Sequence, residues 1–168
     1  QDALTELLSH QGLKSILPKE IARSARYGWP LCIAFIDIDG LSTWNERYGH
    51  ATGDALLAAL SEAFRYGLRD ADVIARVGGD EFVTLLPHAD LIGAQSALER
   101  CRQLFWAIPM GVSGNPKGTF SAGIAQLADH EKEGRPLLER AIQGLFSAKQ
   151  GGGDILFCQP TPRAEQPC

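Results

Sequence analysis

Residues 73–86 read Val-Ile-Ala-Arg-Val-Gly-Gly-Asp-Glu-Phe-Val-Thr-Leu-Leu, which is two apolar runs around a short segment with adjacent glycines. This spacing predicts two antiparallel strands, residues 73–77 and 82–86, joined by a tight turn. Pro87 ends the second run, because proline has no N–H to donate to a ladder. The stretch therefore predicts a β-hairpin with Gly78-Gly79-Asp80-Glu81 at its tip.

The segments around this hairpin alternate between strand and helix patterns. Residues 31–36 are apolar at every position, which is typical of a strand buried on both faces, and they lead directly into Asp37-Ile38-Asp39. Apolar spacing predicts helices and strands elsewhere. The helices are expected over residues 4–27, 41–48, 53–68, 90–106 and 137–148, and the strands over 119–125 and 155–158.

This order of elements predicts one α/β domain with a mixed central sheet. The hairpin has to be antiparallel, whereas the helical connections favour parallel strands. We expect the domain to cover residues 1–158, with an N-terminal helical lead-in over residues 1–29. The Pro-rich residues 159–168 are expected to be a disordered tail.

Composition limits the classes of function. The 168 residues carry a formal net charge of −4, so no global positive field indicates a nucleic-acid partner. No apolar run reaches the roughly 18 residues of a membrane helix. The four cysteines form no CxxC pair, which favours a reducing, cytoplasmic location without structural disulfides. Because the chain begins at Gln1, we expect it to be part of a longer protein with a sensory or membrane domain upstream.

Asp37 and Asp39 form the first candidate site. Carboxylates at the end of a buried strand lie where α/β folds collect ligands, and two oxygen donors suit Mg²⁺ bound together with a phosphate. Capping of the next helix is an equally good interpretation of these two residues alone.

The hairpin tip forms the second candidate site. Gly78 and Gly79 would let the backbone approach a phosphate, because no Cβ is in the way. Asp80 and Glu81 would repel each other unless a cation lies between them. An ordinary acidic turn is the weaker alternative, and the tip therefore indicates a metal–phosphate site.

Asn45 and Asp54 form the third candidate site. An amide and a carboxylate could together recognise the Watson–Crick edge of guanine. The alternative is helix-end chemistry, with Gly49 as a C-cap and Asp54 near a helix N-terminus. This segment alone does not identify guanine.

Together these segments resemble the GGDEF family of diguanylate cyclases. The resemblance rests on several ordered motifs and covers residues 2 to about 157. The matching segments are Asp2-Ala3-Leu4-Thr5, Asp37-Ile38-Asp39, Asn45-x-x-Tyr48-Gly49-His50-x-x-Gly53-Asp54, Arg76-Val77-Gly78-Gly79-Asp80-Glu81-Phe82 and Lys149.

The resemblance implies a fold similar to the palm of nucleotidyl cyclases and the condensation of two GTP molecules into cyclic di-GMP. Two domains would form a homodimer, in which the 3′-hydroxyl of each GTP attacks the α-phosphate of the other and releases pyrophosphate. The implied Mg²⁺ or Mn²⁺ ligands are Asp37, the Ile38 carbonyl, Asp80 and Glu81, of which Asp80 and Glu81 are also the implied catalytic residues. The implied GTP contacts are Leu41, Asn45, Asp54, Gly78, Gly79 and Lys149.

A second motif resembles the inhibitory site of this family. Arg69-Asp70-Ala71-Asp72 matches its R-x-x-D pattern, and Arg100 on the following helix is the expected third residue. Arginine can bind a phosphate or a guanine edge with two hydrogen bonds. The resemblance implies feedback inhibition by cyclic di-GMP, and a solvated charged loop is the alternative.

Two phosphate-binding cations of the family pattern are missing here. Ser42 stands where the family has lysine, and Gly153 where it has arginine; Glu6 also replaces a usual glycine. Lys14, Lys117 and Arg140 are candidate substitutes. We expect an active but weakened cyclase, and the alternative is a catalytically silent domain that binds GTP or cyclic di-GMP as a regulatory module.

Overall fold

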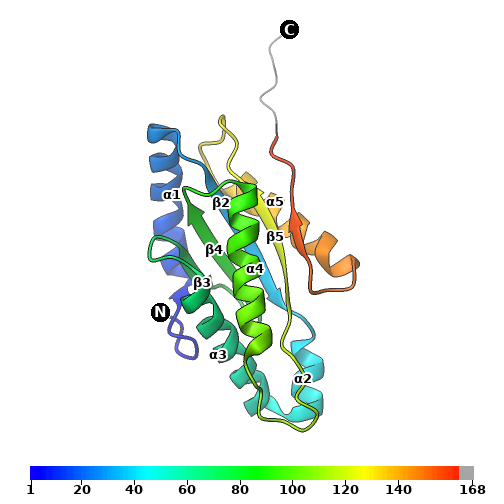
Figure 1. Cartoon of the computed structure of the whole chain (residues 1–168). Helices are drawn as coiled ribbons and strands as arrows, with labels where there is room; N and C mark the ends of the chain where they lie inside the picture. The colour runs from blue at the N-terminus through cyan, green and yellow to red at the C-terminus, as the bar shows by residue number, and fades with distance from the viewer. Residues whose placement is uncertain (163–168) are drawn as a thin grey trace.

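The computed structural model describes residues 1–162 of the chain. Its centre is a six-stranded sheet in the order β1-β3-β4-β2-β5-β6 (Figure 1). The strands are β1 (Leu8–Ser9), β2 (Leu31–Ile38), β3 (Val73–Arg76), β4 (Glu81–Pro87), β5 (Phe120–Gln126) and β6 (Leu156–Cys158). The helices are α1 (His10–Tyr27), α2 (Leu41–Tyr48), α3 (His50–Gly67), α4 (Leu91–Ala107) and α5 (Gly134–Gln150).

The sheet is mixed, as the sequence predicts. The central β2 pairs antiparallel with both β4 and β5, while β1 with β3 and β5 with β6 are parallel pairs. Strands β2 and β3 therefore run in the same direction, with β4 between them. The helical connection α2–α3 thus joins two parallel strands, and this is how helical crossovers coexist with a hairpin in one sheet.

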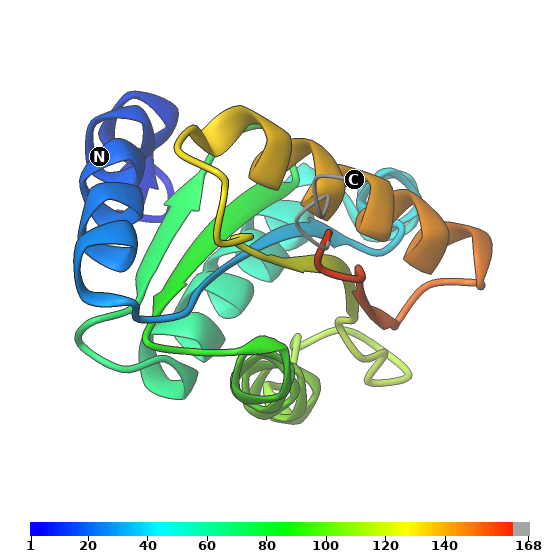
Figure 2. The ribbon, with the colours of Figure 1, turned by 90° about the horizontal axis from the view of Figure 1, so that it is seen from above.

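The helices cover the sheet in two layers (Figure 2), with α1 and α5 on one face and α3 and α4 on the other. Alternate residues of β2 contribute to the two cores. Cys32, Ala34 and Ile36 pack with α3 and α4, whereas Ile33 and Phe35 pack with α1 and α5. The continuous apolar run is thereby explained, because both faces of β2 are covered.

The N-terminal helix begins later than the sequence suggests, so the prediction of helix from residue 4 is wrong. Asp2 instead accepts hydrogen bonds from the backbone N–H and hydroxyl of Thr5, and this turn leads into β1. The Ser9 hydroxyl then accepts a hydrogen bond from the Gly12 N–H and caps α1. Pro18 lies inside the helix without ending it.

The remaining sequence predictions concern the cysteines, membrane spans and the tail. Cys32, Cys101 and Cys158 are free thiols, and Cys168 lies outside the described residues. Among residues 1–162, no helix has the length and apolar character needed to cross a membrane. The predicted disorder of the tail falls largely on residues 163–168, which also lie outside the described part of the chain.

Candidate active site

The residues of the first and second candidate sites meet at the C-terminal end of β2. Asp37 is in register with Glu81 of β4 on one side and with Ser121 of β5 on the other. The hairpin tip follows β3 directly, and the Ile38 N–H donates a hydrogen bond of 3.3 Å to the Asp80 carbonyl. The sheet register therefore places both acidic motifs at one edge.

Lys149, near the end of α5, reaches this edge from the covering helix. Its ammonium lies 2.7 Å from Asp39 Oδ1, 3.4 Å from Asp37 Oδ1 and 3.4 Å from the Ile38 carbonyl oxygen. A lysine more than 100 positions away in the sequence thus contacts the residues that the resemblance assigns to metal binding.

Asp39 is held by donors from the start of β5, from the residue just before that strand and from the loop after α5. The Ser121 hydroxyl donates to Oδ1, while the Thr119 hydroxyl and the Asp154 N–H donate to Oδ2. Burial alone would raise the pKa of Asp39, but these bonds and Lys149 together hold that pKa below its usual value. Asp39 therefore organises the site as a fixed carboxylate. Helix capping, the alternative for this residue, is not its role, because Gly40 is the N-cap of α2 and provides no side chain.

Asp37 has the opposite electrostatic environment. Burial raises its pKa to about 6; the Lys149 charge opposes this rise, and the charges of Asp80 and Glu81 add to it. Carboxylates crowded in this way are stabilised as anions when a cation joins them. The arrangement therefore favours binding of a positive ion beside Asp37.

The two glycines of the tip have different surroundings. A Cβ on Gly78 would lie 2.5 Å from Glu81 Oε2, so a larger residue there would displace the exposed Glu81 carboxylate from its present position. A Cβ on Gly79 would meet nothing within 4 Å. The backbone at Gly79 is thus open to an approaching group, as the sequence predicts for a phosphate.

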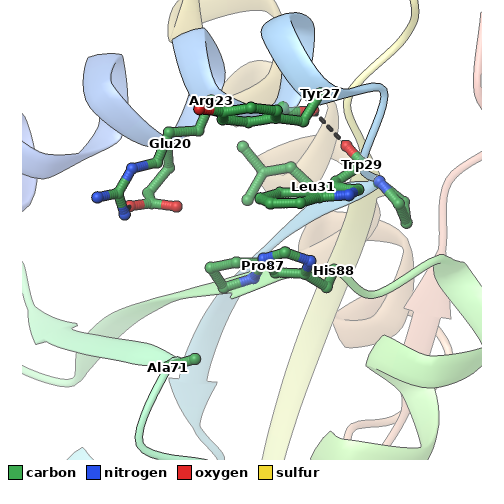
Figure 3. A pocket seen from close by; sticks show the side chains of 10 residues that line it. Glu20, Arg23, Tyr27, Trp29, Leu31, Ala71, Pro87 and His88 are labelled. Atoms are coloured by element: carbon green, nitrogen blue, oxygen red, sulfur yellow. Dashed lines mark hydrogen bonds and ion pairs between the residues drawn. The ribbon is translucent and has the colours of Figure 1, made fainter.

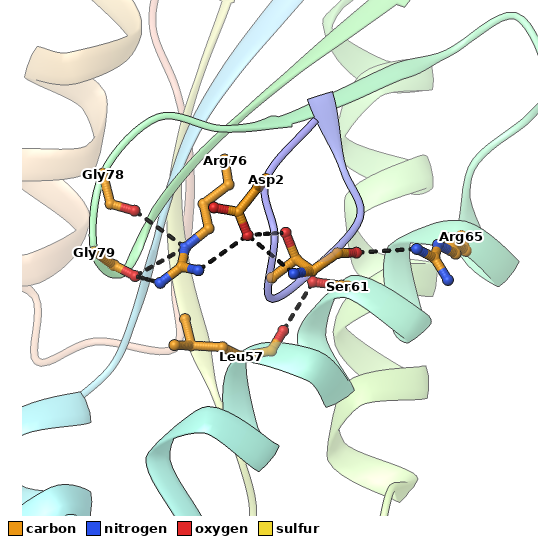
Figure 4. A network of polar contacts seen from close by, with 8 residues as sticks. Asp2, Leu57, Ser61, Arg65, Arg76, Gly78 and Gly79 are labelled. Atoms are coloured by element: carbon orange, nitrogen blue, oxygen red, sulfur yellow. Dashed lines mark hydrogen bonds and ion pairs between the residues drawn. The ribbon is translucent and has the colours of Figure 1, made fainter. Parts of the chain in front are cut away.

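Arg76 fixes the backbone of this tip (Figure 4). Its guanidinium donates to the Gly78 carbonyl at 3.2 Å and to the Gly79 carbonyl at 2.6 and 3.1 Å, and it contacts Asp2 Oδ1 at 3.1 Å. Burial acts to raise the pKa of Asp2, but Thr5 and Arg76 lower it to about 2. Sequence reasoning missed this function of Arg76 and Asp2, although both lie in motifs that it quoted.

Asn45 and Asp54 lie on neighbouring helices next to this edge. The Asn45 Oδ1 atom is buried and has no hydrogen-bond partner, and a Cβ on Gly53 would lie only 1.8 Å from it. Asp54, one residue further along α3, is exposed. The close packing on Gly53 therefore sets the position of the Asn45 amide, and helix-end chemistry accounts for Gly49, which caps α2.

The donor set fits a metal that arrives with a nucleotide. Within residues 1–162, no three Asp, Glu, His or Cys side chains converge closely enough to hold a metal ion by themselves. Mg²⁺ commonly takes only one or two protein carboxylates and completes its shell with substrate phosphates and water. Asp37 and Glu81, in register on adjacent strands, and the Ile38 carbonyl are hard oxygen donors of this kind.

The missing phosphate cations are not replaced by Arg140. This arginine forms an ion pair with Glu131 and donates to the Gln126 carbonyl, which is in register with Cys32 at the opposite end of β2. At the position of the missing arginine, Gly153 has a φ of +85° and lies against Asp39. Ser42 is exposed in the first turn of α2.

The R-x-x-D segment, residues 69–72, lies directly after α3, away from this edge. Asp72 Oδ2 accepts a hydrogen bond from the Arg69 N–H, and the side chain of Arg69 is exposed. Arg100 of α4 donates to the Gly67 carbonyl at 2.8 and 3.0 Å. The structure thus brings Arg100 beside the loop that carries Arg69 and Asp72.

A separate pocket of about 490 Å³ lies at the N-terminal end of β2 (Figure 3). Tyr27 stacks on Trp29 with ring centroids 4.6 Å apart, and the ring centroids of Trp29 and His88 are 4.2 Å apart. Ala71, from the loop that carries the inhibitory motif, also lines it. The pocket contains none of the predicted GTP or metal residues, and nothing in the sequence patterns indicated it.

Comparison with known proteins identifies the family. A family profile described as "Diguanylate cyclase, GGDEF domain" matches residues 1–154. The chain is 41% identical over 156 residues to diguanylate cyclase DgcP of Pseudomonas aeruginosa, and 32% identical over 152 residues to diguanylate cyclase DosC of Escherichia coli. These matches cover 92% and 90% of the chain, but only 23% and 33% of the two relatives.

Solved structures give the same result. Diguanylate cyclase SiaD of Pseudomonas aeruginosa, crystallised with its activator SiaC, superposes with a TM-score of 0.88 at 31% identity, covering 95% of this chain and 61% of SiaD. The coiled coil and GGDEF domain of DgcB from Caulobacter crescentus, in complex with c-di-GMP, superposes with a TM-score of 0.87 at 26% identity, covering 95% and 85%. With the sheet, the hairpin tip and its acidic neighbours in place, this chain belongs to the GGDEF family.

Proposed function

We propose that this domain is a diguanylate cyclase, which condenses two GTP molecules into one cyclic di-GMP and releases two pyrophosphates. The observation that carries the proposal is the meeting of Asp37, the acidic hairpin tip and Lys149 at one sheet edge. This arrangement combines carboxylates for a cation with a lysine for phosphate, which is what phosphoryl transfer by positioning and charge neutralisation requires.

The side chains divide the work between binding and chemistry. Asn45 and Asp54 hold the guanine edge, and the open backbone of Gly79 admits the phosphates. Lys149 binds the phosphate tail. Asp37, the Ile38 carbonyl, Asp80 and Glu81 would hold Mg²⁺ or Mn²⁺, which would neutralise phosphate charge when bound.

The bond change requires two domains. A 3′-oxygen of one GTP forms a bond to the α-phosphorus of the other GTP while the bond to pyrophosphate breaks, and the hydroxyl proton passes to Asp80. The 3′-oxygen of the second GTP then attacks the α-phosphorus of the first in the same way, which releases the second pyrophosphate and closes the ring. Each domain holds one GTP, so a homodimer with facing sites is the catalytic unit.

Substitution at the hairpin tip tests this assignment. Asp80→Ala and Glu81→Ala should each abolish turnover and weaken Mn²⁺ binding in the presence of GTP, whereas guanosine binding through Asn45 should remain. Asp129→Ala, in an exposed loop, is the matched control. Turnover that persists in either tip variant would refute the metal assignment.

Product inhibition is the second part of the proposal. Exposed Arg69 and Arg100 and the half-buried Asp72 lie beside α3 and α4, where we expect them to bind a guanine edge and a phosphate of cyclic di-GMP. Arg69→Ala should leave the initial rate unchanged and raise the inhibition constant for added cyclic di-GMP at least about tenfold, which corresponds to about 1.4 kcal/mol. Unchanged inhibition would make this loop an ordinary charged surface.

A further inference from the structure

The loop between α5 and β6 passes directly beside Asp39. Its residues Gly152, Gly153 and Asp154 have φ values of +105°, +85° and +53°. The first two are glycines, and Asp154 is of a residue type that is enriched among the non-glycine residues in this left-handed conformation. Contacts from another element also reach Asp154.

Arg102 of α4 supplies those contacts. Its guanidinium donates to the Asp154 carbonyl at 2.9 Å and lies 3.1 Å from Asp154 Oδ1. Glu99, one turn earlier on the helix, accepts two hydrogen bonds from the same guanidinium at 2.9 and 3.0 Å. The planar guanidinium is thus oriented from α4 and presented to the loop.

Together with the Thr119 and Ser121 hydroxyls, the loop orients the Asp39 carboxylate that holds Lys149. The Asp154 N–H donates to Asp39 Oδ2 at 2.8 Å, and Lys149 donates to Asp39 Oδ1 at 2.7 Å. A continuous series of short contacts therefore runs from Arg102 through Asp154 and Asp39 to Lys149.

Gly153, which stands at the position of the family's phosphate arginine, lies in this loop against Asp39. A Cβ on Gly153 would lie 3.1 Å from Asp39 Oδ1, at a φ of +85° that favours glycine. The chain therefore relies more on the position of Lys149 than a protein that also has that arginine.

We propose that Arg102 is a positioning residue for binding of the nucleotide phosphates, acting through Asp154 and Asp39 on Lys149. The proposal rests on the proposed function, in which Lys149 contacts the phosphates of GTP. Arg102 itself touches neither nucleotide nor metal; it sets the direction from which the ammonium meets the phosphate tail.

A pair of ligands separates this role from a general structural one. 3′-Deoxy-GTP with Mg²⁺ binds without reacting, because it lacks the attacking hydroxyl, and 3′-deoxyguanosine lacks the phosphates altogether. By calorimetric titration, Arg102→Ala should weaken 3′-deoxy-GTP binding about tenfold. Binding of 3′-deoxyguanosine should stay unchanged, whereas a loosened fold would weaken both ligands alike.

A double-mutant cycle tests whether the effect passes through Lys149. Lys149→Ala should weaken the binding of 3′-deoxy-GTP at least as much as Arg102→Ala does. The double variant should bind this ligand no more weakly than Lys149→Ala alone. Additive losses would overturn the proposal, and so would an unchanged affinity in either single variant. These outcomes differ from failure of the proposed function, which is absence of cyclic di-GMP from the unaltered protein.

Two further variants control for folding. Arg102→Lys keeps a cation within reach of Asp154 and should recover part of the 3′-deoxy-GTP affinity. Arg135→Ala removes an exposed arginine that pairs with Glu139 on α5, and it should affect neither ligand. If Arg102→Lys binds as weakly as Arg102→Ala while both melt at the temperature of the unaltered protein, the ion pair to Asp154 does not position Lys149.

Discussion

At the scale of single residues, the packing of Asn45 on Gly53 sets the position of an amide in the proposed guanine site. Gly53 leaves no room for a methyl group, because its Cβ would lie 1.8 Å from Asn45 Oδ1. The Oδ1 atom lies at the end of the flexible Asn45 side chain, so the side chain can move away from such a methyl at little cost to the fold. The amide would then leave the position from which it meets a base.

Gly53→Ala should therefore separate binding from stability. We expect GTP and guanosine affinity to fall about ten- to hundredfold, or about 1.4–2.8 kcal/mol, with a nearly unchanged melting temperature. Calorimetric titration and thermal unfolding measure the two quantities. Gly93→Ala on α4 is the matched glycine control, and full guanosine affinity in Gly53→Ala would show that Asn45 does not read the base.

Asp37 should make the proposed metal site sensitive to pH. Its pKa of about 6 in the folded protein exceeds its ordinary value of 3.8, so between about pH 4 and 6 the folded state binds more protons than the unfolded state. The free energy of unfolding that depends on Asp37 therefore falls as pH rises through this window. Metal affinity should rise through the same window, because the carboxylate becomes charged.

Asp37→Asn should consequently stabilise the metal-free protein at pH 7. We expect a gain of up to about 1 kcal/mol, since repulsion from Asp80 and Glu81 is removed and Lys149 keeps its 2.7 Å contact with Asp39. Thermal unfolding in the presence of a chelator tests this, and Mn²⁺ titration should show lost binding with GTP present. A variant less stable than the unaltered protein at pH 7 would contradict the electrostatic account.

Single residues also show the limits of sequence reasoning. The glycine and acidic residues of the hairpin tip could be singled out from the sequence because they are adjacent in it. Arg140 could not be excluded as a phosphate cation, since its partner Glu131 lies on a loop whose path depends on the whole fold. Glu6 stands where the family has glycine, and its φ of +57° shows why glycine is usual there.

At the scale of elements, the hairpin and the N-terminal turn act as one unit. Arg76 joins the carbonyls of the tip to Asp2, across 74 positions of sequence. Periodicity and turn chemistry predicted both strands of the hairpin, because these are local properties. The joint between the two elements is a long-range contact, and no local pattern contains it.

Arg76→Ala should release the tip. We expect the free energy of unfolding to fall by about 1–3 kcal/mol, since the partners of a largely buried guanidinium are left unpaired. Turnover should fall at least about tenfold, because Gly78 and Gly79 would no longer be fixed. Denaturant unfolding and steady-state kinetics provide the measurements.

Asp2→Asn gives the graded comparison, since it removes the negative charge opposite Arg76 but leaves an acceptor oxygen and the contacts of Arg76 with the Gly78 and Gly79 carbonyls. It should lower stability with a smaller loss of turnover. Equal turnover in Arg76→Ala and the unaltered protein would show that the tip keeps its geometry without this arginine.

At the scale of the whole molecule, the register of β2 with β4 and β5 assembles the site. Helix α5 then adds Lys149 from one face, and α2 and α3 add Asn45 and Asp54 beside the edge. The mixed α/β class followed from the order of elements, but the strand order required tertiary structure, because β4 inserts between β2 and β3. In the proposed reaction each domain holds one nucleotide, and the reaction therefore needs a second copy.

The most direct test of the account is the product formed from GTP. The protein, dimerised through a fused coiled coil, is incubated with millimolar GTP and Mg²⁺ or Mn²⁺, and the nucleotides are separated by chromatography. The account predicts cyclic di-GMP, with two pyrophosphates released for each molecule formed. Absence of cyclic di-GMP, with GTP or cyclic di-GMP still bound tightly, would contradict it and leave a nucleotide-binding regulatory domain.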